Sequence, residues 1–169
     1  MLLEEINHLP LESAKKLLMQ CCSSATWIKR VLDARPFKDK GELSNAANLA
    51  WNGLTEADLL EAFSGHPKIG DINSLSAKHG DSKALASNEQ RLVEQASETV
   101  LIALSKANEV YLKKYGFIFI VCATGKNSTE MLALLNARLL NDRETELINA
   151  AEEQRKIFQI RLANCVEKE

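Results

Sequence analysis

The sequence is poor in the residues that interrupt helices: its 169 residues include only 7 glycines and 3 prolines. Because few positions break a helix, the composition favours a mostly helical chain. No apolar run approaches the roughly 20 residues that a bilayer-spanning helix needs, so we expect no membrane segment. Residues 1–5 lack the basic start and the long apolar stretch of a signal peptide, and we expect a cytoplasmic protein.

The sequence also lacks an excess of charge of either sign. Its 21 Lys and Arg nearly balance its 23 Asp and Glu, which gives a formal net charge of -2. The basic residues are mostly interleaved with acidic ones, so a nucleic-acid partner is not expected. A chain of this length is predicted to form a single domain, residues 1–169, with a substantial hydrophobic core.

Cysteine is scarce and is not arranged for metal binding. The four cysteines are Cys21, Cys22, Cys122 and Cys165. They include no Cys-x-x-Cys pair, and none of them has a histidine at the spacing of a metal ligand. We therefore expect small buried side chains in a reducing compartment and no metal site.

The spacing of apolar residues predicts an all-α fold, a single-domain helical bundle with one buried extended segment. The predicted helices cover residues 11–22, 26–32, 40–52, 55–63, 88–114, 128–140 and 143–166. Thr55 is suited to the N-cap of its helix, and Asn127 with Glu130 forms a capping pair. Gly116 ends the helix that begins near residue 88. Residues 71–86 are polar and irregular, which is typical of a functional or mobile loop.

The buried extended segment is predicted near residues 117–123, where β-branched and aromatic residues lie between two glycines. No second strand-like segment is evident in the sequence. Its backbone N–H and C=O groups therefore need side chains, water or a ligand as partners, because unpaired buried groups are costly. This need suggests that the segment lines a binding site. A short buried helical turn is the alternative.

One histidine has an unusual setting. Pro67 has a fixed φ and disfavours helical geometry at His66, while Gly65 and Gly70 permit backbone angles that other residues resist. The imidazole is therefore predicted on a stiff, non-helical corner, which suits a proton-transfer group at a pocket. A simple turn or capping role is the alternative for His66.

A carboxylate and a guanidinium lie on apolar helix faces. Glu89 continues the stripe of Leu92 and Val93 towards the start of its helix, where burial raises a carboxyl pKa and the helix dipole opposes that rise. Alternatively, Glu89 is only an acid in the first turn. Arg161 and Gln154 fall within the buried face of the last helix. A buried guanidinium needs an acceptor, whereas an Arg161 that reaches solvent along its stem does not.

Together these elements resemble the OHCU (2-oxo-4-hydroxy-4-carboxy-5-ureidoimidazoline) decarboxylase family over nearly the whole chain. The matching elements, in order, are His66-Pro67-Lys68-Ile69-Gly70, Ser87-Asn88-Glu89-Gln90, residues 116–123, Glu153-Gln154-Arg155-Lys156-Ile157 and Ile160-Arg161-Leu162. The resemblance implies an all-helical fold, no cofactor and a homodimer. It also implies cofactor-independent decarboxylation of a small ureidoimidazoline to (S)-allantoin, the last step from urate to allantoin.

The resemblance also assigns roles to individual residues. It implies that His66 is catalytic, with Glu89 beside it. Many members have serine at the position of Ala86, and Ser87 is the nearest substitute for that hydroxyl. The implied substrate contacts are Pro67, Ala86, Ser87, Gln90, Phe119, Ile120, Val121, Cys122, Ala123 and Arg161.

Two other functions stay open at this point. A helical interaction module with a degenerate pocket is consistent with Ala86. A hydrolase of a related ureide is a weaker alternative, because hydrolysis favours a metal cluster or an activated nucleophile and the sequence shows neither.

Overall fold

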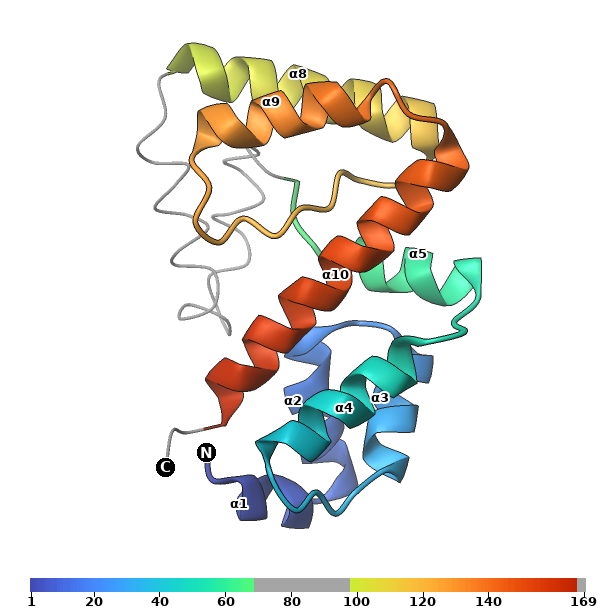
Figure 1. The fold of residues 1–169 in the computed structure, drawn as a ribbon, viewed down its shortest axis with the longest axis vertical. Coiled ribbons are helices and arrows are strands. Elements are labelled where there is room, and N and C mark those ends of the chain that lie inside the picture. The colour runs from blue at the N-terminus through green and yellow to red at the C-terminus, as the bar shows by residue number, and fades with distance from the viewer. Residues whose placement is uncertain (69–97, 167–169) are drawn as a thin grey trace. The chain divides into compact units, whose positions relative to one another are not determined.

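The computed structural model describes residues 1–68 and 98–166, and all regular structure in these ranges is helical (Figure 1). The all-α prediction is therefore confirmed. The helices are α1 (Leu3–His8), α2 (Leu11–Cys21), α3 (Ala25–Asp33), α4 (Lys40–Trp51), α5 (Glu56–Ser64), α8 (Glu98–Tyr115), α9 (Ser128–Arg138) and α10 (Arg143–Cys165). The predicted loop 71–86 and the start of the helix predicted from residue 88 lie outside the described residues.

The chain divides into two compact units. The first, unit 1, comprises Met1–Gly65 with Gln154–Glu169, and the second, unit 2, comprises His66–Glu153. Helix α10 contributes its first part to unit 2 and its second part to unit 1. The single domain expected from the sequence stays a prediction.

The core of unit 1 is built around Trp27 of α3, whose side chain is fully buried. Its indole Nε1 donates a hydrogen bond to the carbonyl oxygen of Ala47 in α4 at 3.0 Å. Its ring lies 4.9 Å from the ring of Phe158 in α10, which in turn lies 5.5 Å from that of Trp51. A buried tryptophan is stable when its N–H finds an acceptor, so one residue joins α3, α4 and α10.

The core of unit 2 is aromatic. Helices α8 and α9 pack side by side (Figure 1). The ring of Tyr111 lies 4.5 Å from that of Tyr115 and 5.4 Å from that of Phe119. The Tyr115 hydroxyl lies 2.8 Å from the carbonyl oxygen of Arg138 and 2.7 Å from that of Asn141. Tyr115 therefore links α8 to the end of α9 and to the turn that follows it.

The predicted helix starts are confirmed where a cap marks them. The Thr55 hydroxyl accepts a hydrogen bond from the backbone N–H of Asp58, and the Asp58 carboxylate accepts one from that of Thr55. Asn127 and Glu130 form the same reciprocal pair at the start of α9. Helix α1, by contrast, was not predicted, because its six residues are too few to show a period.

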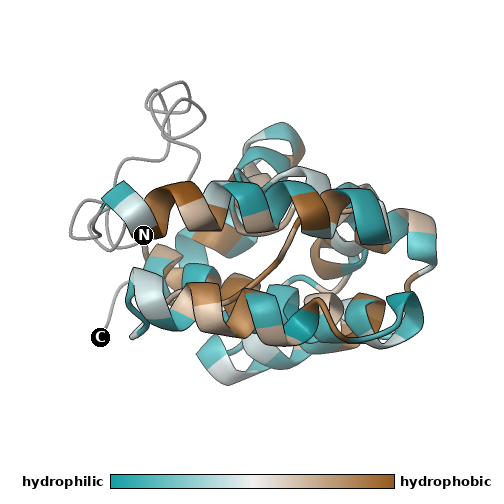
Figure 2. Cartoon of the chain, turned by 90° about the horizontal axis from the view of Figure 1, so that it is seen from above, coloured by the Kyte–Doolittle hydropathy of each residue, from teal (hydrophilic) through white to brown (hydrophobic). Residues whose placement is uncertain are grey.

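Apolar and polar residues alternate along the helices (Figure 2). None of the helices in the described part of the chain combines the length and the apolar character that a bilayer span requires.

Gly65 is needed for space rather than for an unusual backbone angle. Its φ is -75°, which any residue adopts, so the structure does not use the unusual backbone angles that glycine permits here. A Cβ at this position would lie only 2.3 Å from Oγ of Ser23. The Ser23 hydroxyl lies 3.0 Å from the carbonyl oxygen of Glu61 and 3.2 Å from that of Ala62. Glycine thus lets a serine side chain reach the last turn of α5, directly before His66.

We expect Gly65→Ala to lower the free energy of unfolding by about 1–3 kcal/mol, because the added methyl group overlaps Ser23. Urea unfolding of Gly65→Ala, Ser23→Gly and the double variant measures this as a cycle. In the Ser23→Gly background, the cost of Gly65→Ala should nearly disappear. An equal cost in both backgrounds would show that Ser23 is not the cause.

Candidate functional site

The His66 corner leaves helical geometry directly after α5. Residues 66–68 are not helical, as Pro67 predicts, and all three are half-buried. The Lys68 ammonium pairs with the Glu109 carboxylate of α8 at 2.5 Å, with side chains 29% and 57% exposed. A pair this exposed contributes little stability, so its main effect is to tether the chain after His66 to α8.

The extended segment is present where the sequence places it. Phe119, Ile120, Val121, Cys122 and Ala123 are each no more than 8% exposed, and none is helical. The segment follows Gly116, whose φ is +82°, and ends in a turn at Gly125, whose φ is +76°. The alternative of a short helical turn is therefore wrong.

Cationic side chains donate hydrogen bonds to two carbonyl groups of the segment. The Arg138 Nη1 donates to the carbonyl oxygen of Ile120 at 2.6 Å, and the Lys126 ammonium donates to that of Cys122 at 2.9 Å. The backbone N–H of Lys126 donates to the carbonyl oxygen of Ala123 at 3.0 Å. Side chains are thus the hydrogen-bond partners of part of this backbone, one of the three kinds of partner expected from the sequence.

The backbone N–H groups of the same segment, unlike these carbonyl groups, lack a partner among the described residues. Within residues 1–68 and 98–166, no hydrogen bond is donated by the backbone N–H groups of residues 119–123. An unpaired buried amide costs about 1–3 kcal/mol, so consecutive amides of this kind are suited to a bound carbonyl or carboxylate. The arrangement can therefore bind an electron-rich group of a ligand.

A fully buried carboxylate, Glu146 of α10, organises the side chains behind this segment. Its Oε2 accepts hydrogen bonds from Nε of Arg138 at 2.8 Å and from the Tyr111 hydroxyl at 2.5 Å. Its Oε1 accepts from the side-chain amides of Asn141 at 2.8 Å and Asn149 at 3.1 Å. We call these five residues the Glu146 network.

Electrostatics keep Glu146 ionised. Burial raises the pKa of its carboxyl, but the hydrogen bonds from Arg138, Tyr111, Asn141 and Asn149 outweigh burial, so the pKa lies below its ordinary value. Burial and donation to Glu146 raise the pKa of Tyr111, which therefore keeps its proton. A buried anion surrounded by donors is a rigid centre, since removing any donor leaves charge uncompensated.

Arg138 connects this network to the extended segment. Its guanidinium carbon lies 4.6 Å from the ring centre of Phe119, in addition to the hydrogen bond to Ile120. Its side chain is only 12% exposed, and its ion pair with Glu146 measures 2.8 Å. A guanidinium suits this position because it can stack and donate in several directions at once.

Arg161 lies in the part of α10 that belongs to unit 1. It is half-buried, and its Nη1 donates to the backbone carbonyl oxygen of Gln20 at 3.2 Å. The predicted burial of this helix face is therefore confirmed for Gln154, which is fully buried, and only in part for Arg161.

The described residues contain some of the predicted site. The segment 119–123 and the His66–Pro67 corner belong to unit 2, whereas Arg161 belongs to unit 1. Outside the described residues lie Ala86, Ser87, Glu89 and Gln90. That Glu89 lies beside His66 and that Arg161 contacts the substrate thus stay predictions.

Two functional candidates, Arg138 and Glu146, were missed by sequence reasoning. Arg138 follows the buried Met131 and Leu135 by seven and three residues, which places it on the buried face of α9. Glu146 precedes the buried Ala150 by four residues on α10. A charged residue at a core position of a helix was the available signal in both cases.

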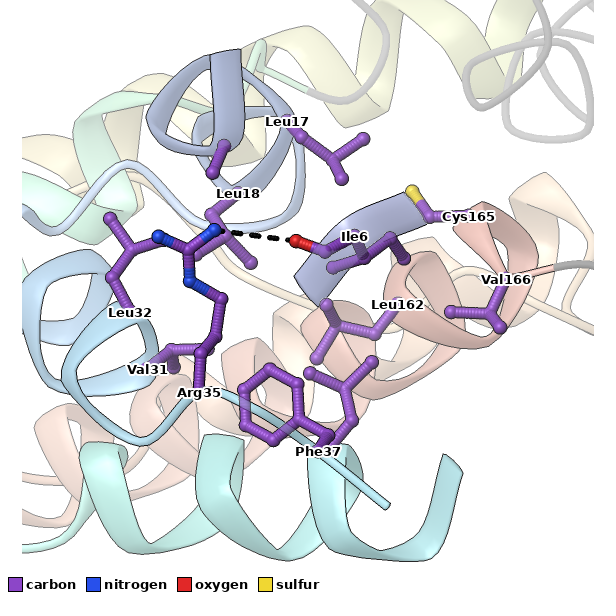
Figure 3. Close-up of a pocket in the computed structure, with 12 residues that line it drawn as sticks. Ile6, Leu17, Leu18, Val31, Leu32, Arg35, Phe37, Leu162, Cys165 and Val166 are labelled. Atoms are coloured by element: carbon purple, nitrogen blue, oxygen red, sulfur yellow. Dashed lines mark hydrogen bonds between the residues drawn. The ribbon is translucent and has the colours of Figure 1, made fainter. Parts of the chain in front are cut away.

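The pocket in Figure 3 lies within unit 1 and is lined mainly by apolar residues from α2, α3 and α10. The one charged residue in its lining, Arg35, donates to the carbonyl oxygens of Ile6 at 3.3 Å and Leu9 at 3.1 Å. None of the predicted site residues lines this pocket. It is a feature of core packing rather than a candidate substrate site.

Comparison with known proteins gives one consistent family. A family model described as OHCU decarboxylase matches residues 7–163. The "Uric acid degradation bifunctional protein TTL" of Arabidopsis thaliana is 36% identical over 85% of this chain, which spans only 44% of that longer protein. A "2-oxo-4-hydroxy-4-carboxy-5-ureidoimidazoline decarboxylase" of Haloferax volcanii is 23% identical, with 95% of this chain and 94% of that protein covered.

A solved structure extends the likeness to the fold. It is described as a crystal structure of OHCU decarboxylase in the presence of (S)-allantoin, and it is 35% identical. The match has a TM-score of 0.72 and covers 87% of this chain and 94% of that one.

We expect Glu146→Gln to lower the free energy of unfolding by about 3–5 kcal/mol at pH 7, because Arg138 loses its buried partner. Since the folded-state pKa of Glu146 is below its unfolded value, its contribution is present above the unfolded value, near 4.3, and is lost as pH falls through the folded value. The difference from wild type should therefore shrink on acidification. Urea unfolding at pH 7, 5 and 3 measures it.

The matched control is Glu144→Gln, an exposed acid in the first turn of the same helix. This variant should differ little from wild type at any of the three pH values. A cost of Glu146→Gln that stays constant from pH 7 to pH 3 would contradict an ionised, hydrogen-bonded Glu146.

Proposed function

Because this chain belongs to the OHCU decarboxylase family, we propose that its own reaction is the release of CO2 from 2-oxo-4-hydroxy-4-carboxy-5-ureidoimidazoline to give (S)-allantoin. The chain is a decarboxylase, a carboxy-lyase of the conversion of urate to allantoin. The observation that carries the assignment is the family match over residues 7–163. The residue roles that follow are proposed on the same basis.

The substrate chemistry fits a site built from protein groups alone. The substrate is a five-membered ring with a hydroxyl and a carboxylate on one carbon. Loss of CO2 leaves electron density that the adjacent imine delocalises. The reaction therefore needs no metal or prosthetic group as an electron sink, and we propose that the enzyme uses none.

The backbone amides of Phe119–Ala123 are proposed to bind the ring carbonyl and the ureido group, where negative charge accumulates. Donors that are fixed before the reaction stabilise such charge without reorganisation. The support is that the N–H groups of residues 119–123 have no acceptor among the described residues, although these residues are buried. Arg161 is proposed to assist at the same groups.

Arg161 is not proposed to bind the departing carboxylate. A cation there would stabilise the charged ground state more than the transition state and would slow the reaction. Apolar side chains suit the carboxylate better, because weaker solvation favours its conversion into neutral CO2. Phe119, only 1% exposed, is a candidate for that role. Ile69 is a second candidate and lies outside the described residues.

His66 is proposed to move the proton, at the substrate hydroxyl or at the carbon that loses CO2. Its position on a half-buried, non-helical corner supports this role. Glu89 is proposed to fix the tautomer and orientation of the imidazole. Pro67, Ala86, Ser87 and Gln90 are proposed to contact the substrate.

The enzyme is further proposed to work as a homodimer in the cytoplasm. The dimer follows from the resemblance. The compartment is supported by the four cysteines, all of which are free thiols as in a reducing environment.

We expect His66→Asn to fold normally but to lose about 10²–10⁴-fold in kcat/KM, because proton transfer by a positioned group contributes about that much. Circular dichroism of the product, with freshly generated substrate, measures both the rate and the handedness of allantoin. His8→Asn is the matched control, because His8 is exposed and should be dispensable.

Three outcomes would count against parts of this proposal. Racemic allantoin formed by wild type at the uncatalysed rate would exclude the activity. Wild-type turnover by His66→Asn would remove His66 from the mechanism. Unchanged kinetics in Glu89→Gln, which keeps the shape and removes the charge, would reduce Glu89 to a helix-capping residue.

A further inference from the structure

We propose that Arg138 and Lys126 are positioning residues that aim two particular amides of the extended segment, those of Val121 and Ala123, at the substrate. This inference rests on the proposed function of the segment and specifies which of its N–H groups bind. It assigns a role to the Glu146 network as the support of Arg138.

The argument starts from the planarity of the peptide unit. In a trans peptide the C=O of one residue and the N–H of the next point in opposite directions. The Ile120 carbonyl points at Arg138, at 2.6 Å, so the N–H of Val121 points away from Arg138. The Cys122 carbonyl points at the Lys126 ammonium, at 2.9 Å, so the N–H of Ala123 points away from Lys126. Each cation therefore sets the direction of one amide.

Arg138 is itself held from several sides. Its Nε and Nη2 contact Oε2 of Glu146 at 2.8 Å, and Nη2 lies 3.3 Å from the Tyr111 hydroxyl oxygen. Its ring contact with Phe119 adds a second constraint on the same segment. Lysine cannot reproduce this set of contacts, because a single ammonium group lacks the planar fork of donors.

Arg143 offers a matched control. Its Nε donates to the carbonyl oxygen of Tyr115 at 3.0 Å, and its guanidinium carbon lies 5.7 Å from the ring centre of Phe117. It thus makes the same two kinds of contact as Arg138, but with Tyr115 and Phe117, which precede residues 119–123 in the chain. Loss of Arg143 should affect stability without changing the direction of the Val121 amide.

The test compares Arg138→Met, Arg138→Lys, Lys126→Met and Arg143→Met, each assayed well below its own melting temperature. We expect Arg138→Met to lower kcat by up to about 100-fold, the cost of roughly 1 Å of misplacement, with a smaller change in KM. Arg138→Lys should recover part of that loss, and Lys126→Met should show a milder loss. Arg143→Met should keep wild-type kcat and KM despite a lower melting temperature.

The inference is overturned if wild type is active and Arg138→Met resembles Arg143→Met in kcat and KM. A wild-type chain without decarboxylase activity would instead overturn the proposed function, and this inference would fall with it. The split between kcat and KM separates positioning from stability, because a smaller folded fraction would not change KM.

A separate observation, the contact between Cys21 and Cys165, supports a second inference. We propose that a peroxide converts these two thiols into a disulfide that joins the ends of α2 and α10. Their sulfur atoms lie 3.9 Å apart, and both residues belong to unit 1. A disulfide needs the sulfur atoms to approach by roughly another 2 Å, which small rotations of two side chains at helix ends can provide.

The two thiols differ in the way that this chemistry requires. Cys165 is half-buried, whereas Cys21 is fully buried. The hydrogen bond between Cys165 and Cys21, with the positive charges of the N-terminus and Arg161, lowers the pKa of Cys165. The hydrogen bond to Cys165 and burial raise the pKa of Cys21. Because peroxide can reach only the half-buried thiol, Cys165 is assigned as the nucleophile and Cys21 as the thiol that completes the bridge.

The reaction balances with hydrogen peroxide as the oxidant. The Cys165 thiolate attacks one peroxide oxygen and becomes a sulfenic acid, while the O–O bond breaks and hydroxide leaves. The Cys21 sulfur then attacks the Cys165 sulfur, and the hydroxyl group leaves with the Cys21 proton as water. Two thiols and one peroxide thus give one disulfide and two waters.

The bridge would lie beside a proposed substrate-binding residue. Arg161 is one helical turn before Cys165, and its acceptor, the Gln20 carbonyl, directly precedes Cys21. The disulfide and this hydrogen bond therefore join the same two helix ends. If the proposed role of Arg161 holds, oxidation should change KM reversibly.

The test treats the fully reduced chain with hydrogen peroxide and follows its intact mass, its thiol count and its disulfide-linked peptides. We expect the mass to fall by two hydrogen atoms, with a Cys21–Cys165 peptide that a dithiol reductant removes. Cys21→Ala and Cys165→Ala should each prevent the bridge, and Cys22→Ala should not. Sulfinic acid at Cys165 without a bridge, or a bridge that persists in Cys165→Ala, would overturn the inference.

Discussion

The packing of the helices in unit 2 depends on the burial of one charge, the Glu146 carboxylate. An ion without water is costly unless donors surround it, and here those donors come from three helices. Tyr111 belongs to α8, Arg138 to α9 and Asn149 to α10 with Glu146 itself. The helices must keep their register for the anion to stay satisfied. Arg138 extends that requirement to the non-helical segment through the Ile120 carbonyl.

No strand of the described part of the chain pairs with the extended segment, and its carbonyl groups and N–H groups differ in their partners. Its carbonyl groups at Ile120 and Cys122 face cations of the protein, whereas its amides face none of the described acceptors. A carbonyl paired in this way stabilises the native state. An amide left for a ligand costs stability until the ligand arrives. The cost of unpaired backbone therefore lies with these N–H groups, while the carbonyl groups of Ile120 and Cys122 are paired.

What the sequence predicted well was local. Helix starts at Thr55 and Asn127 follow from cap residues three positions before an acid, and the extended segment follows from its own composition between glycines. The space that Gly65 provides depends on Ser23, 42 positions away, and no local pattern contains it. The Arg138–Glu146 pair likewise depends on packing between α9 and α10. Of the candidate site, the buried segment and the His66 corner could be predicted, and the residues that support the segment could not.

The pairing of Arg138 with Glu146 also bears on which charges the proposed reaction can tolerate. An uncompensated guanidinium beneath the amides would attract the substrate carboxylate and stabilise the state that must lose CO2. The ionised Glu146 cancels that charge at short range, since the pair is only 2.8 Å apart. In the proposed site, the substrate then meets only the directional dipole of each amide, which acts on the atom in front of it rather than on any nearby anion. A neutral ion pair behind oriented amides is therefore better suited to decarboxylation than a cation in the same place.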